Sequence, residues 1–135
     1  MRFLSFLPFA ALLAAPVHAG DPAAGERQWR QCQSCHVIVD NDGNRIQGAG
    51  VSGPNLYGVI GRPAGSVEGF RYSPSMQAAA DAGLVWDEES FVAYVTNPTA
   101  FLRDFLNDPS ARGSMGWQMR SNQADMFAYL ESVAE

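Results

Sequence analysis

Apolar and polar positions along the chain predict a short leader followed by a single folded domain. Residues 3–15 are almost wholly apolar, follow Arg2 and end near a small-residue cleavage site at Ala19. This pattern is typical of a secretory signal peptide, because the apolar run is too short to span a bilayer. We therefore expect residues 1–19 to be cleaved off, leaving an exported domain over residues 20–135.

Within that domain, helix-capping residues followed by apolar positions at helical spacing predict five helices. No segment of useful length has the two-residue period of a strand, and Gly- and Pro-rich stretches predict turns and loops over 40–53, 53–72 and 107–120. The expected fold class is therefore all-α, with long loops. The predicted helices run from Asp21 toward residue 32, from Ser73 to about Gly83, from Asp87 to the residue before Pro98, from Asn97 over a short span, and from Ser121 to the C-terminus with Met126, Phe127, Leu130 and Val133 as its apolar stripe.

The charged residues are unusual because the chain has no lysine. Nine arginines stand against fourteen acids, which gives a formal net charge of −5. Loss of Arg2 with the leader leaves eight arginines and a net charge of −6. Net charge affects solubility and encounter rates rather than the fold, and this sign disfavours nucleic-acid binding.

Both cysteines of the chain lie in the segment Cys32-Gln33-Ser34-Cys35-His36. The C-x-x-C-H spacing is the signature of covalent attachment of a c-type haem. On a helix the two thiols would share one face, so each could form a thioether with a haem vinyl group while His36 binds the iron. A redox dithiol would require a βαβ context and a zinc site would require further ligands. A structural disulfide is the remaining alternative, which a mass without added haem would support. We predict one covalently bound haem c held by Cys32 and Cys35.

The second axial ligand of the iron is a matter of counting side chains. His36 is the only histidine outside the predicted leader, and four methionines remain as candidates. Met76 and Met126 fall inside predicted helices, where methionine usually packs in the core. Met115 has a glycine close on either side, which lets the backbone bend tightly over a flat cofactor. Met115 is the first candidate, Met119 the second and an open or exchangeable position the third.

Together these features resemble the class I c-type cytochromes, and specifically the bacterial cytochrome c2 subgroup, over essentially all of residues 20–135. The resemblance implies a small helical shell around one haem with one edge exposed. The matching residues and segments are Gly25, Cys32–His36, Gly53-Pro54-Asn55-Leu56-Tyr57-Gly58, Gly61-Arg62, Phe70-Arg71-Tyr72-Ser73, Trp86-Asp87-Glu88-Glu89, Tyr94, Asn97-Pro98, the Met115 loop and Ala128-Tyr129-Leu130.

The resemblance also implies roles for individual residues. The backbone carbonyl of Pro54 would accept a hydrogen bond from His36, which fixes the imidazole tautomer and raises its basicity. The hydroxyl of Tyr94 would approach the sulfur of Met115. Donors to the haem propionates would be Arg62, Tyr72, Ser73 and Trp86, and the contact between the first and last helices would be made by Gly25, Trp29 and Tyr129.

Two departures from the family pattern concern the surface. Residues 102–112 form an expanded segment, and the lysines that ring the docking face of the family are absent. Arginines at or near basic positions of cytochromes c2 would give a local positive rim on an acidic body. These arginines are Arg30, Arg103, Arg112 and Arg120.

A fully ligated haem iron transfers electrons instead of binding oxygen, and a thioether ligand raises its potential. We therefore expect a soluble, monomeric periplasmic one-electron carrier that is not an enzyme. It would dock transiently to membrane redox complexes, taking electrons from a quinol:cytochrome c oxidoreductase and passing them to a terminal oxidase, a reductase or a photosynthetic reaction centre. The alternative is a haem-based gas or small-ligand binding protein with a labile axial Met115. A peroxidase with a single haem would require an open iron face and a distal acid–base residue.

Overall fold

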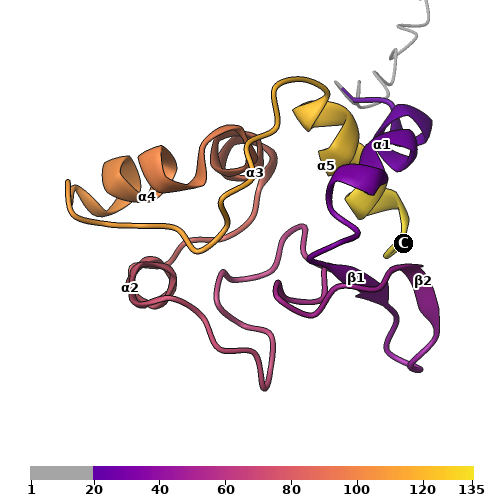
Figure 1. Cartoon of the computed structure of the whole chain (residues 1–135), viewed down its shortest axis with the longest axis horizontal. Coiled ribbons are helices and arrows are strands. Elements are labelled where there is room, and N and C mark those ends of the chain that lie inside the picture. The colour runs from indigo at the N-terminus through magenta and orange to yellow at the C-terminus, as the bar shows by residue number, and fades with distance from the viewer. Residues whose placement is uncertain (1–19) are drawn as a thin grey trace, which may run out of the picture.

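The computed structural model describes residues 20–135, so the predicted signal peptide at residues 1–19 lies outside the described residues. None of the described helices is long and apolar enough to cross a membrane. In chain order the elements are α1 (Pro22–Gln28), the short 3-10 helix η1 (Trp29–Gln31), β1 (Val37–Val39), β2 (Arg45–Gly48), α2 (Pro74–Asp81), α3 (Glu88–Thr96), α4 (Pro98–Leu106) and α5 (Gln123–Ser132) (Figure 1).

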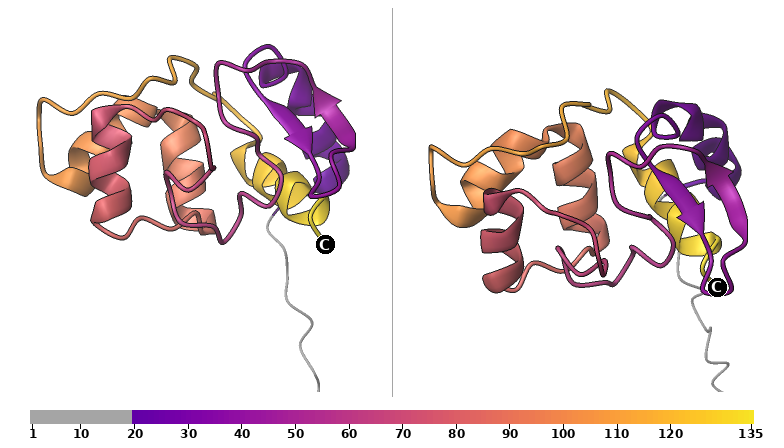
Figure 2. Two further views of the ribbon diagram at one scale, coloured as in Figure 1. Left: turned by 90° about the horizontal axis from the view of Figure 1, so that it is seen from below. Right: turned by 60° about the horizontal axis from the view of Figure 1, so that its bottom comes forward.

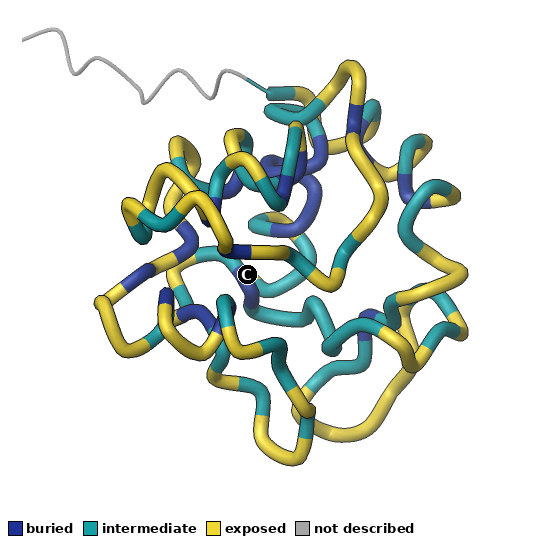
Figure 3. Tube along the Cα trace, turned by 60° about the vertical axis from the view of Figure 1, so that its left-hand side comes forward, coloured by how far each residue is buried: buried dark blue, intermediate teal, exposed yellow. Residues whose placement is uncertain are grey.

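The helices form two groups joined by long loops. Helices α1 and α5 lie side by side next to the β1–β2 hairpin, and α2, α3 and α4 form the second group (Figures 1 and 2). Helix α5 also packs against α3, so it connects the two groups. Buried and exposed stretches alternate along the trace (Figure 3), as expected for helices that each turn one face inward. The all-α prediction is confirmed for the overall class.

The first and last helices meet at a glycine. A Cβ atom on Gly25 would lie 2.0 Å from the carbonyl oxygen of Asp125, so no larger residue permits this approach. Next to this crossing, the rings of Trp29 and Tyr129 meet edge to face with their centroids 6.5 Å apart. The contact expected between Gly25, Trp29 and Tyr129 is therefore present, and it fixes the helix that precedes the cysteine motif.

Side-chain caps begin the helices where the sequence predicted them, with one exception. The side chains of Asp21, Ser73 and Asn97 accept hydrogen bonds from the first turns of α1, α2 and α4. The predicted cap of the last helix at Ser121 is wrong, because α5 begins after Asn122. Asn122 has a left-handed backbone (φ +62°), which asparagine tolerates better than most residues, and its side-chain amide donates to Asp125.

The cap of α3 is reciprocal. The Asp87 carboxylate accepts from the backbone N–H of Ser90 (2.8 Å), and the Ser90 hydroxyl accepts from the backbone N–H of Asp87 (3.1 Å). The hydrogen bond from the Ser90 backbone N–H, and after it the bond with the Ser90 side chain, hold the pKa of Asp87 below its ordinary value. Because the pKa of Asp87 is lower in the folded protein, its carboxylate stabilises the folded state at pH values above the ordinary pKa. This contribution is lost as the pH falls through the lowered pKa.

We predict that Asp87→Ala lowers the free energy of unfolding by about 1 kcal/mol at neutral pH. Asp87→Asn should keep most of the stabilisation by the cap. Its free energy of unfolding should lose the part of the pH dependence that the Asp87 carboxyl contributes. Chemical denaturation at pH 7 and near pH 3 measures both effects, with Glu88→Ala as a control on the same helical turn. Equal stability of Asp87→Ala and the native protein at pH 7 would show that the cap contributes nothing.

The expectation that no strands form is wrong for one short hairpin. Strands β1 and β2 pair antiparallel, with Val37 opposite Gly48 and a register shift between Ile38 and Val39. Strands of three and four residues are too short to reveal a two-residue period in the sequence. The polar segment between them does turn at Asp42 and Gly43, as predicted, with Gly43 at φ +85°.

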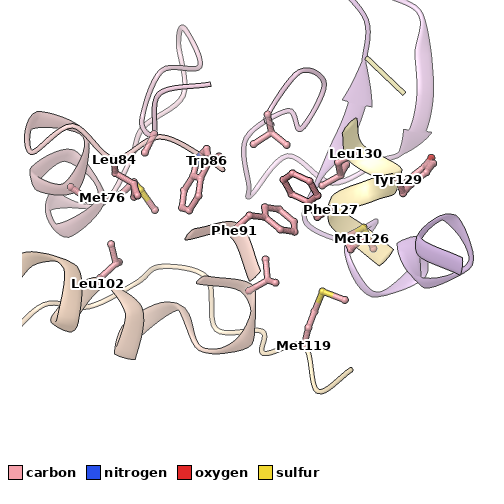
Figure 4. Close-up of a cluster of buried hydrophobic side chains, with 14 of the residues drawn as sticks. Met76, Leu84, Trp86, Phe91, Leu102, Met119, Met126, Phe127, Tyr129 and Leu130 are labelled. Atoms are coloured by element: carbon pink, nitrogen blue, oxygen red, sulfur yellow. The ribbon is translucent and has the colours of Figure 1, made fainter. Parts of the chain in front are cut away.

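Apolar side chains of both helix groups and of the connecting loops form one buried core. Figure 4 shows that its side chains come from both groups and from the loops between them. The larger members are Trp29, Ile38, Met76, Leu84, Trp86, Phe91, Leu102, Met119, Met126, Phe127, Tyr129 and Leu130. This core continues into the wall of the candidate site.

Candidate functional site

A cavity of about 400 Å³ opens between the two helix groups. All of the residues that the sequence singled out for cofactor or metal binding line it, although they come from segments up to 83 positions apart. The structure therefore brings the whole predicted set together at one place. Its members are Cys32, Cys35, His36, Pro54, Arg62, Tyr72, Ser73, Trp86, Tyr94 and Met115.

The cysteine motif lies on a turn. Helix α1 ends at Gln28, and η1 leads into a turn over residues 32–35, so the expectation that the motif lies on a helix is wrong. The turn is closed by hydrogen bonds from the backbone N–H groups of Cys35 (3.1 Å) and His36 (2.9 Å) to the carbonyl of Cys32. The second of these bonds has the spacing of a single helical turn, so both cysteines still reach the cavity wall.

Neither cysteine forms a disulfide among residues 20–135, and the surroundings of Cys32 disfavour its thiolate. Burial, and then the neighbouring Cys35, raise the pKa of Cys32 to about 11. A redox dithiol needs a thiolate stabilised near neutral pH, which requires a lowered pKa. This site therefore disfavours the thioredoxin-like alternative.

Only one of the two ring nitrogens of His36 is hydrogen-bonded within the described residues. Its Nδ1–H donates to the carbonyl oxygen of Pro54 (2.7 Å), so Nε2 keeps its lone pair. The ring packs closely against Gly53, where an added Cβ would sit 2.3 Å from Cε1. Burial lowers the pKa of His36 against the opposing effect of the Pro54 bond, which favours the neutral ring that a metal requires.

Arg62 gives the cavity a positive charge. Its two terminal nitrogens donate to the carbonyls of Tyr57 (3.0 Å) and Asn55 (3.2 Å). The buried Nε has no hydrogen-bond partner among residues 20–135. Burial also lowers the pKa of Arg62. Since a buried donor without a partner is costly, this atom fits an anionic group in the cavity.

Two hydroxyl groups that line the same cavity accept hydrogen bonds from the backbone. The Tyr72 hydroxyl oxygen accepts from the backbone N–H of Val67 (3.0 Å), and the Ser73 hydroxyl oxygen accepts from that of Met76 (3.2 Å). Each can therefore still donate into the cavity. With Arg62 they form a donor set suited to the carboxylates of a haem.

Most of the remaining lining is apolar, and the sequence predicts these apolar residues mainly as core; the polar members are Gln31, Ser52, Arg71 and Ser114. Met76, Trp86, Phe91, Met119 and Met126, which belong to the apolar cluster of Figure 4, all line the cavity. The apolar residues that the sequence did not propose for the site are Leu56, Val59, Phe70, Met76, Phe91, Val95, Trp117, Met126 and Leu130, and Met119, the second candidate for the axial ligand, lines it as well. An apolar chamber with a few donors fits a large flat cofactor that carries carboxylates.

Tyr94 and Trp86 form an aromatic wall in this chamber, with ring centroids 4.9 Å apart. Burial raises the pKa of Tyr94 to about 12. The hydroxyl therefore stays protonated at neutral pH and can donate a hydrogen bond.

Two residues support the site without having been assigned a role in the sequence. The amide of Asn55 accepts from the N–H of Val39 (3.0 Å) and donates to its carbonyl (2.8 Å), which fastens the Pro54 segment to the hairpin. Gly53 lets that segment approach the His36 ring. The only signal for either was their place in the Gly53-Pro54-Asn55 segment.

Comparison with known proteins gives a consistent set of relatives. The chain is 52% identical to cytochrome c-551 of Roseobacter denitrificans over 98% of this chain and 96% of that protein. It is 52% identical to cytochrome c2 of Rhodovulum adriaticum over 85% and 94%, respectively. The structure is similar to that of cytochrome c2 from Rhodobacter capsulatus, with a TM-score of 0.84 and 40% identity over 86% of this chain and all of that one. No protein-family model matches the chain.

Proposed function

The chain belongs to the cytochrome c2 family, and we propose that it works in the periplasm with its haem iron bound by His36 and Met115. Cytochromes c2 are electron carriers and not enzymes, and each carries one covalently bound haem c. The chain is accordingly an electron carrier with one haem c. The haem supplies an iron that changes between ferrous and ferric states by one electron.

The observation that carries the proposed ligation is the hydrogen bonding of the two ring nitrogens of His36. Its Nδ1 is occupied by Pro54 and its Nε2 is free in a cavity that also contains both cysteine side chains. Cys32 and Cys35 would anchor the cofactor, and the Pro54 bond would keep the imidazole oriented and basic. Arg62, Tyr72, Ser73 and Trp86 would bind the propionates.

Met115 is supported over the other three methionines by its position. All four line the cavity, but Met76 and Met126 belong to α2 and α5. Met119 is 2% exposed and belongs to the packed core, whereas Met115 is half-buried in a loop between Gly113 and Gly116. A methionine outside a helix can bring its sulfur to an iron position that the helical methionines could reach only by repacking.

The face around Trp117 is proposed as the docking surface. Trp117 lines the cavity and is still 53% exposed, so it joins the site to the protein surface. In the part of the chain that the structure describes, no aspartate or glutamate lines this cavity, although the chain has fourteen acids. This favours transient docking of the Trp117 face to membrane complexes whose docking surface is not strongly basic. The donor would be a quinol:cytochrome c oxidoreductase, and the acceptor an oxidase, a reductase or a photosynthetic reaction centre.

The haem state tests this proposal directly. We predict that mass spectrometry finds one haem covalently bound, and that the ferric spectrum shows low-spin iron with the far-red sulfur–iron charge-transfer band. Electron exchange with a membrane quinol-oxidising complex should be fast and depend on salt concentration. A high-spin ferrous protein that binds carbon monoxide at once would instead support the gas-binding alternative, and absence of haem would contradict both.

A further inference from the structure

The loop that carries Met115 is fastened to two helices by side-chain hydroxyl groups. The backbone N–H of Arg112 donates to the Ser75 hydroxyl in α2 (2.9 Å). The next N–H, that of Gly113, donates to the Thr99 hydroxyl in α4 (3.1 Å). Two successive backbone amides, the second of them two residues before Met115, are thus held by two different helices.

Packing and a third hydrogen bond strengthen the same attachment. A Cβ on Gly113 would lie 3.2 Å from the Cβ of Pro98, so the loop already touches the first turn of α4. Ala111 is buried, and its carbonyl accepts from the Nε of Arg103 (3.0 Å). The loop before Met115 therefore has a fixed position on α4.

Beyond Met115 the loop is fastened again only at Met119. Its N–H donates to the carbonyl of Val95 at the end of α3 (2.8 Å), and its carbonyl accepts from the Gln123 side chain (2.9 Å). Within residues 20–135, no hydrogen bond holds the five intervening residues, 114–118. Met115 therefore lies on a short span whose position depends on its two ends.

We infer that Ser75 and Thr99 are positioning residues that hold the Met115 sulfur at the haem iron. This inference rests on the proposed ligation by Met115. A span fixed at both ends has few conformations, so its methionine rebinds quickly after each dissociation. Loss of one hydroxyl leaves a backbone amide without its partner and releases one end, which favours the state with the sulfur away from the iron.

Competition by imidazole for the ferric iron of the haem-loaded protein tests this role. Thr99→Val removes the hydroxyl at nearly constant volume, Thr99→Ser retains it, and Ser75→Ala removes the other acceptor. We expect the apparent imidazole affinity to rise about fivefold in Thr99→Val and in Ser75→Ala, as loss of one hydrogen bond implies. The double variant should exceed both, while Thr99→Ser should remain close to the native protein. The control is Ser66→Ala, whose hydroxyl bonds to Pro63 away from the loop.

The far-red sulfur–iron band and amide hydrogen exchange at Gly113 complete the test. Faster exchange at Gly113 with a weaker band in Thr99→Val, both restored in Thr99→Ser, would support the inference. If the native protein shows the band and none of the variants changes imidazole affinity, the inference is overturned while the proposed ligation stands. If the native protein lacks the band, the ligation by Met115 fails and the inference fails with it. Should Thr99→Val not fold, Ser75→Ala and Thr99→Ser decide the question.

Discussion

Replacing Met115 by leucine is expected to abolish the far-red sulfur–iron band and to leave a high-spin ferrous protein that binds carbon monoxide at once. Leucine has a similar volume but no thioether, so the iron would lose a ligand while the loop keeps its size. A thioether favours ferrous iron, and its loss should lower the reduction potential by an amount on the order of 0.1 V, within the range that axial ligands span. Visible and far-red spectroscopy with a redox titration measures both effects.

Met119→Leu is the matched control for this prediction. Met119 is buried and lines the same cavity, so its replacement changes packing by a similar volume. We expect it to keep the band and to lower the free energy of unfolding by less than about 1.5 kcal/mol. The reverse result, with the band lost in Met119→Leu and kept in Met115→Leu, would assign the ligand to Met119.

The helices were predictable because their ends are chemically marked. Asp21, Ser73, Asp87 and Asn97 each cap the helix predicted for them, since a short side-chain acceptor can satisfy the free N–H groups of a first turn. Asn122 was missed because it caps through a left-handed backbone instead of a side-chain acceptor. Backbone conformation of this kind leaves little trace in one sequence.

The hairpin was unpredictable for a different reason. Its strands are short, and part of its edge bonds to the side chain of Asn55, sixteen positions beyond Val39. A side chain that completes a distant strand has no local pattern. Tertiary contacts thus decide the structure at this point, whereas local chemistry decides it at the helix ends.

The candidate site was predictable in its chemistry and less so in its shape. The cysteines and histidine have a spacing that only their chemistry explains, and the roles of Arg62, Tyr72 and Trp86 came from the resemblance alone. The sequence predicts the residues of the apolar wall, including Met76 and Met126, as core, because a core position and a cofactor wall both require an apolar side chain. The sequence does not predict a role for the hydroxyl groups of Ser75 and Thr99, because polar helix residues outside a motif carry no signal.

Replacing Gly53 by alanine is expected to disturb the proximal side of the site by pressing directly on the imidazole of His36. The added Cβ would lie 2.3 Å from Cε1 and 2.6 Å from Nδ1 of His36, so the ring or the backbone must move, and the 2.7 Å bond to Pro54 must lengthen. Overpacking of this kind costs about 1–3 kcal/mol of unfolding free energy. A weaker Pro54 bond also makes the imidazole less basic, so the reduction potential should rise.

Gly116→Ala provides the comparison, because nothing lies within 4 Å of a Cβ at Gly116. It adds the same methyl group and reduces the freedom of the unfolded chain equally, so its stability should be unchanged or higher by up to about 1 kcal/mol. Thermal unfolding and redox titration of the two haem-loaded variants measure the difference between them. Because Gly116 is next to the proposed ligand Met115, the far-red sulfur–iron band is recorded for both variants, and a difference in potential with the band unchanged is assigned to the His36 ring and its bond to Pro54. Equal stability and equal potential in both variants would mean that the close packing of His36 on Gly53 does not hold the imidazole in place.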